Sequence, residues 1–586
     1  MPWTILTDSQ THTALYAALA SIPIVYLFWA LAYRRMKGHW ASLSTLGIAL
    51  LVSILGFGMP AGMAAMASLD GMAFGIWPIC WIILPALVIF NLSVKTGDFA
   101  IIKNSLAVIT DDRRLQALLV AFSFGAFIEG CAGFGTPVAI TGAVLVGLGF
   151  PPLIAAGVCL LANTAPVAFG SIGIPILVAG DISGVDTFAI SQMAGRTLPF
   201  ITGFVPLYLV ILLSGWRRGL EVWPAALVSG GSFAIAQWYT ANYIGPMLPD
   251  IISSVISIVS LTVFLRFWHP RQSWTFEHEP LSGGRAQLHY TKGQVLRAWA
   301  PFMILTVCVA GWGVVPLKHL LDLHGLFKFH VPGLDGLVLH DGKAMDAVFQ
   351  LNLLSAAGTA VALAACFSVI VTGASPAVVR EVLILTLKGM RLPVLSISSI
   401  IGFAYIMKYS GMATALGLAF AATGMLFPFF SALLGWLGVF MTGSDTSANA
   451  LFGKLQQETA VHIGVDPVVT VSANSVGGVC GKMISPQSLS VAAAAVGLAG
   501  RESDIFRYTI VHSLILAGVI GVMAFLQAYV LTWMIPRIVP GALAGAASGG
   551  LVLPGESYLV LTVGLAAAVA ILARILGRAP AQPTGS

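Results

Sequence analysis

The chain has 586 residues, of which 58% are hydrophobic and only 9% are charged. Soluble proteins carry about 25% charged residues, so this composition excludes a water-soluble globular fold. The net charge of +6 comes from Lys and Arg residues scattered through short loops without a basic stripe, which argues against a nucleic-acid partner.

Apolar runs of about 20 residues recur along the chain, and each is long enough to cross the hydrocarbon core of a bilayer. They begin with residues 15–33, 40–58 and 76–94 and end with 558–576. The basic cluster Arg34, Arg35 and Lys37 follows the first run, so we interpret that run as a span and not as a cleaved signal peptide. The sequence predicts an all-α polytopic membrane protein with about thirteen spans and two re-entrant or broken hairpins.

Basic residues in short loops set the orientation. If residues 34–37 lie inside, the basic segments 95–114, 266–297 and 380–391 also lie inside, and the acidic loop 181–186 lies outside. We therefore expect a multi-pass protein of a bacterial-type cytoplasmic membrane, with the N-terminus outside and the C-terminus inside. The surrounding partner is the lipid bilayer, and a homo-oligomer is compatible with this arrangement.

An internal repeat relates the two halves. Four residues of the first half recur at a constant offset of 311 positions: Asn163, Gly170, Pro175 and Arg196 match Asn474, Gly481, Pro486 and Arg507. The charge-derived topology places Lys95 inside and Lys408 outside, so the halves are predicted to have opposite orientations. Secondary transporters use such inverted repeats to build a site near the bilayer midplane. The alternative is that shared Gly, Ser and Ala content produces these sparse identities.

Charge, polarity and the repeat divide the chain into seven segments. These are N-terminal spans with the first scaffold (1–94), the first transport core (95–219), connecting spans with an inside linker and an outside insertion (220–346), the second scaffold (347–410), the second transport core (411–536), a final span (537–576) and a disordered tail (577–586).

The segment FIEGCAGFGTPVAI at residues 127–140 places a carboxylate, Glu129, in an apolar run. Gly133, Gly135 and Pro137 follow it and disfavour a continuous helix, so we predict a break there. Non-helical backbone inside a bilayer must be buried or line a watered cavity. A half-helix starting at Thr136 would offer free N–H groups to the carboxylate of a small anion.

The corresponding segment of the second half, TGSDTSAN at residues 442–449, is rich in hydroxyl groups. We predict that it forms a substrate cradle, with Ser444, Thr446, Ser447 and Asn449 around Asp445. Acids within a membrane are costly and usually functional. Glu129 in its apolar setting is the expected proton carrier, and Asp445 is expected to stay charged or to coordinate. The alternative for both acids is a helix cap or a satisfied buried hydrogen bond.

Further polar residues interrupt two related spans and complete the predicted substrate site. They are Asn163, Thr164 and Ser171 in the first half, and Asn474, Ser475, Lys482 and Gln487 in the second. Lys482 is the expected countercharge for an anion, with snorkelling to an interface as the alternative. Arg196 and Arg507 are candidates for gating or for interfacial anchoring. The Cys and His residues lack metal-ligand spacing, so neither a metal nor a cofactor is predicted beyond protons as coupling ion.

Four of these stretches resemble the L-lactate permease family: FIEGCAGFGTPVAI at 127, LANTAPVAFGSIG at 161, TGSDTSANALFGKLQ at 442 and SANSVGGVCGKMISPQS at 472. The resemblance runs over residues 11–576. It implies proton-coupled symport of L-lactate, D-lactate or glycolate by an inner-membrane protein, and it directs attention to Glu129, Asn163, Asp445 and Lys482. Members of this family are similar to a broader group of ion transporters with paired hairpins, and this similarity implies elevator-like alternating access.

Three other functions compete with this expectation. Sodium-coupled carboxylate symport is one, because unwound Ser, Thr and Asn backbone also coordinates Na⁺. A membrane-embedded enzyme is another, although the chain lacks a nucleophile–base constellation. A passive channel is the third, and it would not need acids beside broken helices in two inverted halves.

Overall fold

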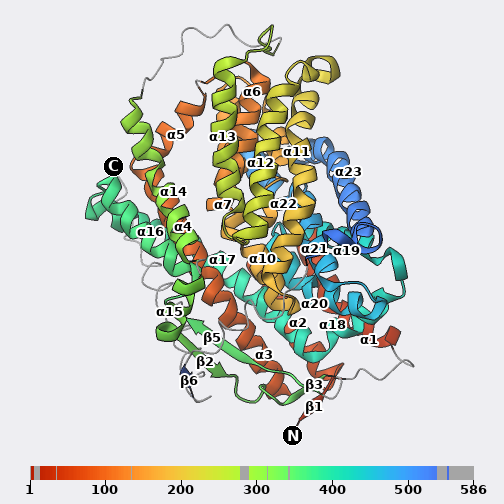
Figure 1. Cartoon of the computed structure of the whole chain (residues 1–586). Helices are drawn as coiled ribbons and strands as arrows, with labels where there is room; N and C mark the ends of the chain where they lie inside the picture. The colour runs from red at the N-terminus through yellow and green to blue at the C-terminus, as the bar shows by residue number, and fades with distance from the viewer. Residues whose placement is uncertain are drawn as a thin grey trace, which may run out of the picture.

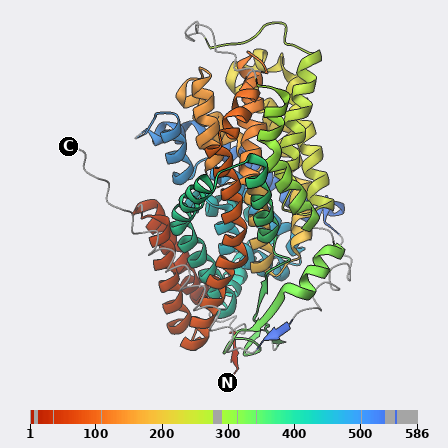
Figure 2. The same ribbon diagram turned by 90° about the vertical axis from the view of Figure 1, so that its left-hand side faces the viewer.

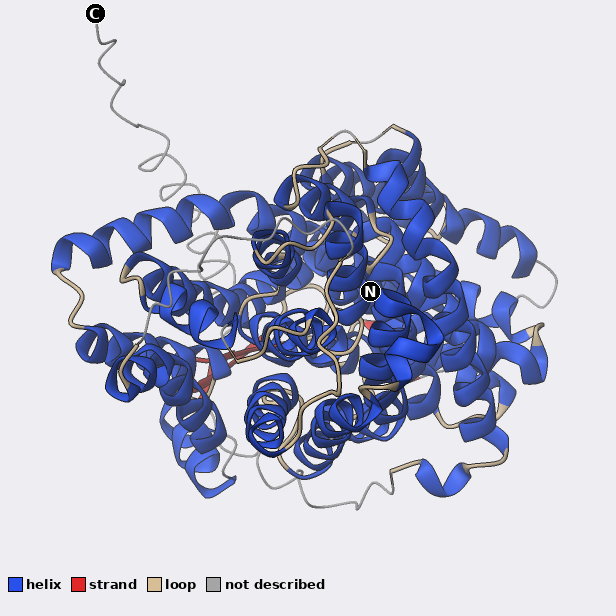
Figure 3. Ribbon diagram, turned by 90° about the horizontal axis from the view of Figure 1, so that it is seen from above, coloured by secondary structure: helices blue, strands red, loops and turns tan. Residues whose placement is uncertain are grey.

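The structure is a computed structural model that describes residues 2–5, 13–34, 36–107, 109–133, 135–276, 290–312, 315–340, 343–499, 501–536 and 551–553. Helices make up most of it (Figures 1 and 3). This confirms the prediction of a polytopic helical membrane protein. The predicted final span at 558–576 and the tail at 577–586 lie outside the described residues.

The first half of the chain contains the helices from α1 to α11. These elements are α1 (Thr13–Phe28), η1 (Trp29–Tyr33), α2 (Gly38–Leu55), α3 (Ala61–Phe74), η2 (Gly75–Cys80), α4 (Trp81–Lys95), α5 (Asp98–Ala107), α6 (Arg113–Ala117), η3 (Leu118–Phe124), α7 (Gly125–Cys131), α8 (Thr136–Gly147), α9 (Pro152–Ala162), η4 (Val167–Phe169), α10 (Gly170–Ser183) and α11 (Thr187–Leu220).

Connecting helices lead into the second half. These elements are α12 (Trp223–Tyr243), α13 (Pro249–Phe267), α14 (Lys292–Trp312), α15 (Val315–Gly325), α16 (Ala357–Thr372), α17 (Pro376–Ser410), α18 (Met412–Ala421), η5 (Gly424–Leu426), α19 (Phe427–Thr442), α20 (Asp445–Ile463), α21 (Pro467–Lys482), α22 (Pro486–Ala495), α23 (Glu502–Tyr529) and η6 (Thr532–Met534).

The described residues contain fewer helices of spanning length than the whole sequence predicted, and the predicted final span lies outside them. Among the described residues, ten helices are long and apolar enough to cross a bilayer, or eleven if α9 and α10 form one bent span. The expectation was about thirteen. The difference arises partly because α8, α16 and α18 are apolar but have only 12, 16 and 10 residues. A helix needs about 20 residues to cross the hydrocarbon core.

Short strands form at the end of the molecule where the N-terminus lies (Figures 1 and 2). One sheet has the order β1 (Trp3–Thr4), β3 (Val338–His340), β4 (Lys343–Ala344), and the other β5 (Val348–Asn352), β2 (Leu326–His330), β6 (Leu551–Leu553). Strands β2 to β4 lie in or beside the insertion predicted at residues 318–343, for which no strand was expected. They do not alter the helical character of the spanning region.

Helices break at the predicted positions in both halves. Between α7 and α8 the backbone turns through Gly133 and Gly135, whose φ angles are +57° and +81°. Between α19 and α20 it turns through Gly443 at φ +72°. Left-handed backbone is accessible to glycine because it has no Cβ, so these residues let the chain leave the helix inside the bundle. The expected break in each hairpin is confirmed.

A second pair of breaks lies in the spans that follow the hairpins. Helices α9 and α10 meet at 62° through residues 163–166. Helix α10 then passes through Ser171, Ile172 and Gly173, all with positive φ. A β-branched residue such as Ile172 is rarely left-handed, so strain is concentrated at this turn. In the second half, α21 and α22 are separated by residues 483–485.

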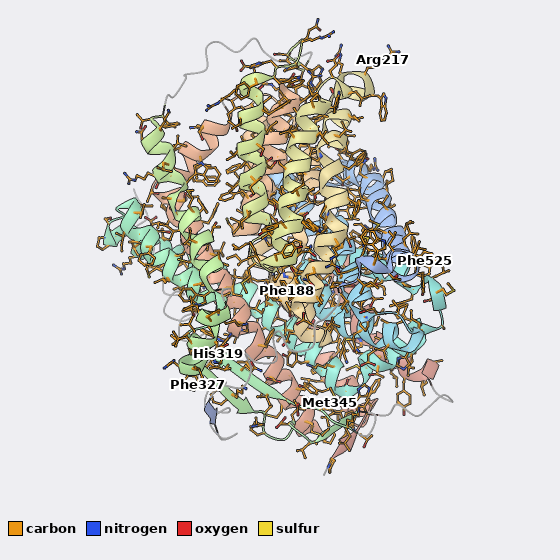
Figure 4. The ribbon with its side chains drawn as sticks, in the orientation of Figure 1. Phe188, Arg217, His319, Phe327, Met345 and Phe525 are labelled. Atoms are coloured by element: carbon orange, nitrogen blue, oxygen red, sulfur yellow. The ribbon has the colours of Figure 1, made fainter. Side chains whose placement is uncertain are left out.

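The last long helices of the two predicted repeats, α11 and α23, are antiparallel. Thr197 and Gln527 share hydrogen bonds of 2.9–3.2 Å, and Tyr208 lies 2.5 Å from Nδ1 of His512. Residue numbers rise along α11 as they fall along α23. Figure 4 shows α11 running from Phe188 up to Arg217 near the opposite end of the molecule. Antiparallel partners are what an inverted repeat requires, although the repeat itself stays a prediction.

Candidate functional site

Glu129 lies in the last turn of α7, directly before the first break. Its side chain is 2% exposed and packs against the backbone of Gly170 at the start of α10. A Cβ on Gly170 would stand 2.7 Å from Oε1 of Glu129, so no larger residue fits there. Asn163, in the bend after α9, donates from Nδ2 to Oε2 of Glu129 at 3.0 Å. The two predicted residues are thus brought together.

Lys482 approaches the same carboxylate from the second half of the chain. It is the last residue of α21, where the negative end of the helix dipole favours a cation. Its Nζ lies 2.5 Å from Oε1 of Glu129, and the lysine is only 8% exposed. The lysine is thus paired with Glu129 in this structure, and its role as countercharge for an anion stays a prediction. Its burial excludes snorkelling to an interface.

Asp445 begins α20 directly after the second break. Ser444 caps this helix, because its Oγ accepts from the N–H of Ser447, so Asp445 is not the cap. Ser475 on α21 donates to Oδ2 of Asp445 at 2.7 Å. Asn449, one turn along α20, donates to Ser475 at 3.1 Å and to the carbonyl of Pro175 at 3.1 Å. These predicted residues form one buried network.

The network extends through Asn474, a predicted site residue, to Gln456 and Ser431, which the sequence analysis did not select. Asn474 donates to Oδ1 of Asn449 at 2.9 Å, and Gln456 donates to Oδ1 of Asn474 at 3.0 Å. Gln456 in turn accepts from Ser431 at 2.6 Å. Polar residues on α19, α20 and α21 therefore satisfy one another in the core. Gln456 is the last residue of the stretch TGSDTSANALFGKLQ, which carried the family resemblance but in which Gln456 was not selected as a site residue.

Asp250 is the most conspicuous residue that the sequence analysis missed. It lies in the first turn of α13, is 1% exposed, and has no hydrogen-bond partner on either carboxyl oxygen among the described residues. A Cβ on Gly130 would be 2.8 Å from Cβ of Asp250. The carboxyl group interacts electrostatically with Glu129 and Lys482. In the sequence, Asp250 is an acid next to a proline at the edge of an apolar run, and this position is typical of the membrane–water interface.

One lysine therefore contacts the carboxylate of Glu129 and lies within electrostatic range of those of Asp250 and Asp445. Asp445 also interacts electrostatically with Lys482 and Glu129. Around this cluster, Asn163 Oδ1, Thr164 Oγ1 and Asp445 Oδ1 are buried without a hydrogen-bond partner in the described residues. Unsatisfied buried polar atoms are rare and call for a ligand, a water or an ion. The cluster can bind an anion if the lysine is released, and it can store protons on its acids.

The remaining predicted residues lie around the breaks or at a distance. Ser171 donates to the carbonyl of Ala132 at 3.4 Å, and it lies against Gly133. Gly135 is the N-cap of α8, which begins at Thr136 as predicted. Gln487 is exposed beside Gly443, and Thr446 is half-buried in the first turn of α20.

The two arginines are not part of the cluster. Arg196 donates to Asn242 at 2.9 Å and to the carbonyl of Met534 at 2.7 Å, on the wall of a cavity of about 440 Å³. Arg507 is exposed on α23. Arg196 thus links the start of α11 to the end of the second half, whereas Arg507 makes no side-chain hydrogen bond or ion pair with the residues that the structure describes.

Comparison with known proteins identifies the family. The model of the L-lactate permease family matches residues 16–531. The chain is 49% identical to the L-lactate permease of Bacillus subtilis, 51% to the glycolate permease GlcA of Escherichia coli and 50% to the L-lactate permease of Escherichia coli. These alignments cover 91–92% of this chain and 99–100% of the relatives.

Among solved structures, the chain is similar to the YdaH transporter of Alcanivorax borkumensis. The identity is 15% and the TM-score 0.44, over 80% of this chain and 89% of that one. The family match extends over nearly the whole chain and includes every residue of the buried cluster. This protein belongs to the L-lactate permease family.

Proposed function

We propose that this protein is a proton-coupled symporter of small 2-hydroxy monocarboxylates, namely L-lactate, D-lactate and glycolate, in a bacterial cytoplasmic membrane. The names of its relatives, L-lactate permease and glycolate permease, support this substrate class and favour a transporter over an enzyme. The observation that carries the mechanism is the buried ion pair between Lys482 and Glu129 at the helix breaks.

Charge conservation explains how this pair couples substrate to protons. With Glu129 ionised and Lys482 charged, the pair is neutral and the lysine is occupied. A proton on Glu129 removes the partner of Lys482, which then holds the carboxylate of one substrate molecule. That state is neutral again, so one proton enters with each monocarboxylate. Keeping a buried site neutral avoids the large cost of an unpaired charge in low dielectric.

The broken helices support the remaining steps of the proposal. The N-terminus of α8, whose first turn contains Pro137, offers free N–H groups to an anion. Asn163 and the network around Asp445 position the carboxylates. The two hairpins would carry the site across the membrane in an elevator-like movement, exposing it first to one aqueous side and then to the other.

Transport by purified protein in liposomes tests this proposal. We expect an imposed proton gradient without sodium to drive accumulation of radiolabelled L-lactate, and excess unlabelled glycolate to compete with it. Accumulation driven by a sodium gradient alone would instead favour sodium coupling, with the free Oδ1 of Asp445 as a candidate ligand. Absence of saturable lactate uptake under either gradient would reject the substrate class.

A further inference from the structure

A long cavity lies between α13 and α14, and neither Glu129 nor Lys482 lines it. Its volume is about 810 Å³, and α5 and Phe127 of α7 complete its walls. Arg266 and Lys292 line it together with Ile251 and Val307, so the end of α13 lies beside the start of α14. Figure 1 shows α14 standing apart from α13 along this length.

The walls of the cavity are apolar and open to the bilayer. Val259 and Val263 of α13 are 55% and 46% exposed, and Leu296 and Val307 of α14 are 64% and 72% exposed. From Ile251 to Arg266 the helix rises about 22 Å, at 1.5 Å per residue. One leaflet of hydrocarbon is about 15 Å thick, half of the bilayer core. The cavity is therefore long enough for an extended acyl chain.

One end of the cavity is basic. Arg266, Lys292 and Tyr290 line that end, and neither basic side chain has a hydrogen-bond or ion-pair partner within the described part of the chain. Asn104 donates to the hydroxyl of Tyr290 at 3.1 Å and so holds the ring in place. Farther along the wall, Oγ1 of Thr262 is buried without a partner in the described residues. The polar groups thus gather at one end of an apolar groove.

We propose that this groove is a binding site for an anionic phospholipid. Its phosphate would lie between Arg266 and Lys292, and one acyl chain would lie along Val259, Val263 and Leu296. The charge of the basic pair complements a lipid phosphate, and basic residues close to a membrane surface favour anionic lipids. A soluble anion would not use the apolar wall, and a zwitterionic lipid would bring an ammonium group beside the two cations together with its phosphate.

The groove also touches the helix that carries Glu129. Phe127 lines it and packs against Trp299 and Phe302 of α14, with ring centroids 4.9 Å apart in both pairs. A lipid in the groove would therefore contact the aromatic cluster through which α7 packs against α14. We expect anionic lipid to change the rate of transport as well as to bind.

Native mass spectrometry of the detergent-purified full chain tests the site. We expect phosphatidylglycerol to bind in preference to phosphatidylcholine, and the preference to fall about tenfold or more in the double variant Arg266→Gln/Lys292→Gln. The matched control is Arg217→Gln/Arg218→Gln, an exposed basic pair outside the groove. Retained preference in the groove variant, or equal loss in the control, would overturn the proposal.

A second variant tests the apolar wall of the groove. Val259→Trp should fill the groove and weaken binding of both lipids, whereas Ile235→Trp on α12, a residue 71% exposed outside the groove, should not. Size-exclusion chromatography of each variant checks that it is folded. If Val259→Trp instead changes the oligomeric state and leaves lipid binding intact, the groove is covered by a second copy of the chain and not by lipid.

Discussion

Glu129 and Lys482 are 353 positions apart in sequence and meet in the core. A buried ion pair is weak evidence for stability, but removing one partner leaves an uncompensated charge. We expect Lys482→Gln to lower the free energy of unfolding by about 3–5 kcal/mol. Glu129→Gln/Lys482→Gln should recover much of that loss. Thermal unfolding in detergent measures both, and additive losses in the double variant would show that the two residues are not coupled.

Transport assays should separate the proton-carrying role of Glu129 from its pairing with Lys482. We expect Glu129→Gln to retain lactate exchange between the two sides of a liposome, because a neutral amide leaves Lys482 free for the substrate. Accumulation driven by a proton gradient should be lost, because the amide binds no proton. Uptake and counterflow assays measure the two activities. Accumulation at the wild-type level in this variant would remove Glu129 from the coupling mechanism.

Substitutions at Lys482 and at Arg196 are expected to change substrate affinity to different extents. Lys482 lies in the buried cluster, whereas Arg196 holds Asn242 and the carbonyl of Met534. We expect Lys482→Ala to raise the KM for lactate by at least tenfold, and Arg196→Ala to change it much less. Initial rates in liposomes measure this. Equal and small effects would assign anion binding to helix N-termini alone.

At the scale of elements, the break between α7 and α8 depends on a glycine. At Gly133 the φ angle is +57°, and a Cβ would stand 2.0 Å from Oγ of Ser171. We expect Gly133→Ala to destabilise the fold by at least about 1–2 kcal/mol, the usual cost of left-handed backbone for other residues. It should also reduce uptake, because the break positions Glu129.

The matched control is Gly231→Ala in α12, where a Cβ would meet nothing within 4 Å. Alanine is favoured over glycine inside a helix by about 1 kcal/mol, so this variant should be at least as stable as the wild type. Circular dichroism melts and lactate uptake compare the two. Similar behaviour of both alanine variants would mean that the left-handed turn at Gly133 does not matter.

At the scale of the whole molecule, the antiparallel pairing of α11 and α23 makes a topological prediction. Arg196 contacts Met534, and α11 rises about 27 Å from Arg196 to Ser214 before it breaks at Gly215, just before Arg217. In a background without the six native cysteines, Arg217→Cys and Trp533→Cys should react with a membrane-impermeant thiol reagent from opposite sides. Labelling of both from one side would exclude the inverted arrangement of these helices.

The breaks were predictable because their causes are local. Gly133, Gly135 and Gly443 disfavour helix whatever surrounds them, and Pro137 suits a first helical turn. The partners of the acids had no such local signal. Asp250 stands at the edge of an apolar run, where the sequence indicates an interface, and only the packing of α13 against α7 places it beside Gly130.

The sequence by itself determined the membrane fold, the helix breaks and the polar residues beside them, because hydropathy, glycine and proline act over a few neighbouring positions. Only the tertiary structure decided that Lys482 pairs with Glu129, that Asp250 joins them and that Arg507 does not. Such pairings depend on the approach of helices from distant parts of the chain. Burial then fixes which charges must compensate one another, since an unpaired charge in low dielectric is too costly to keep.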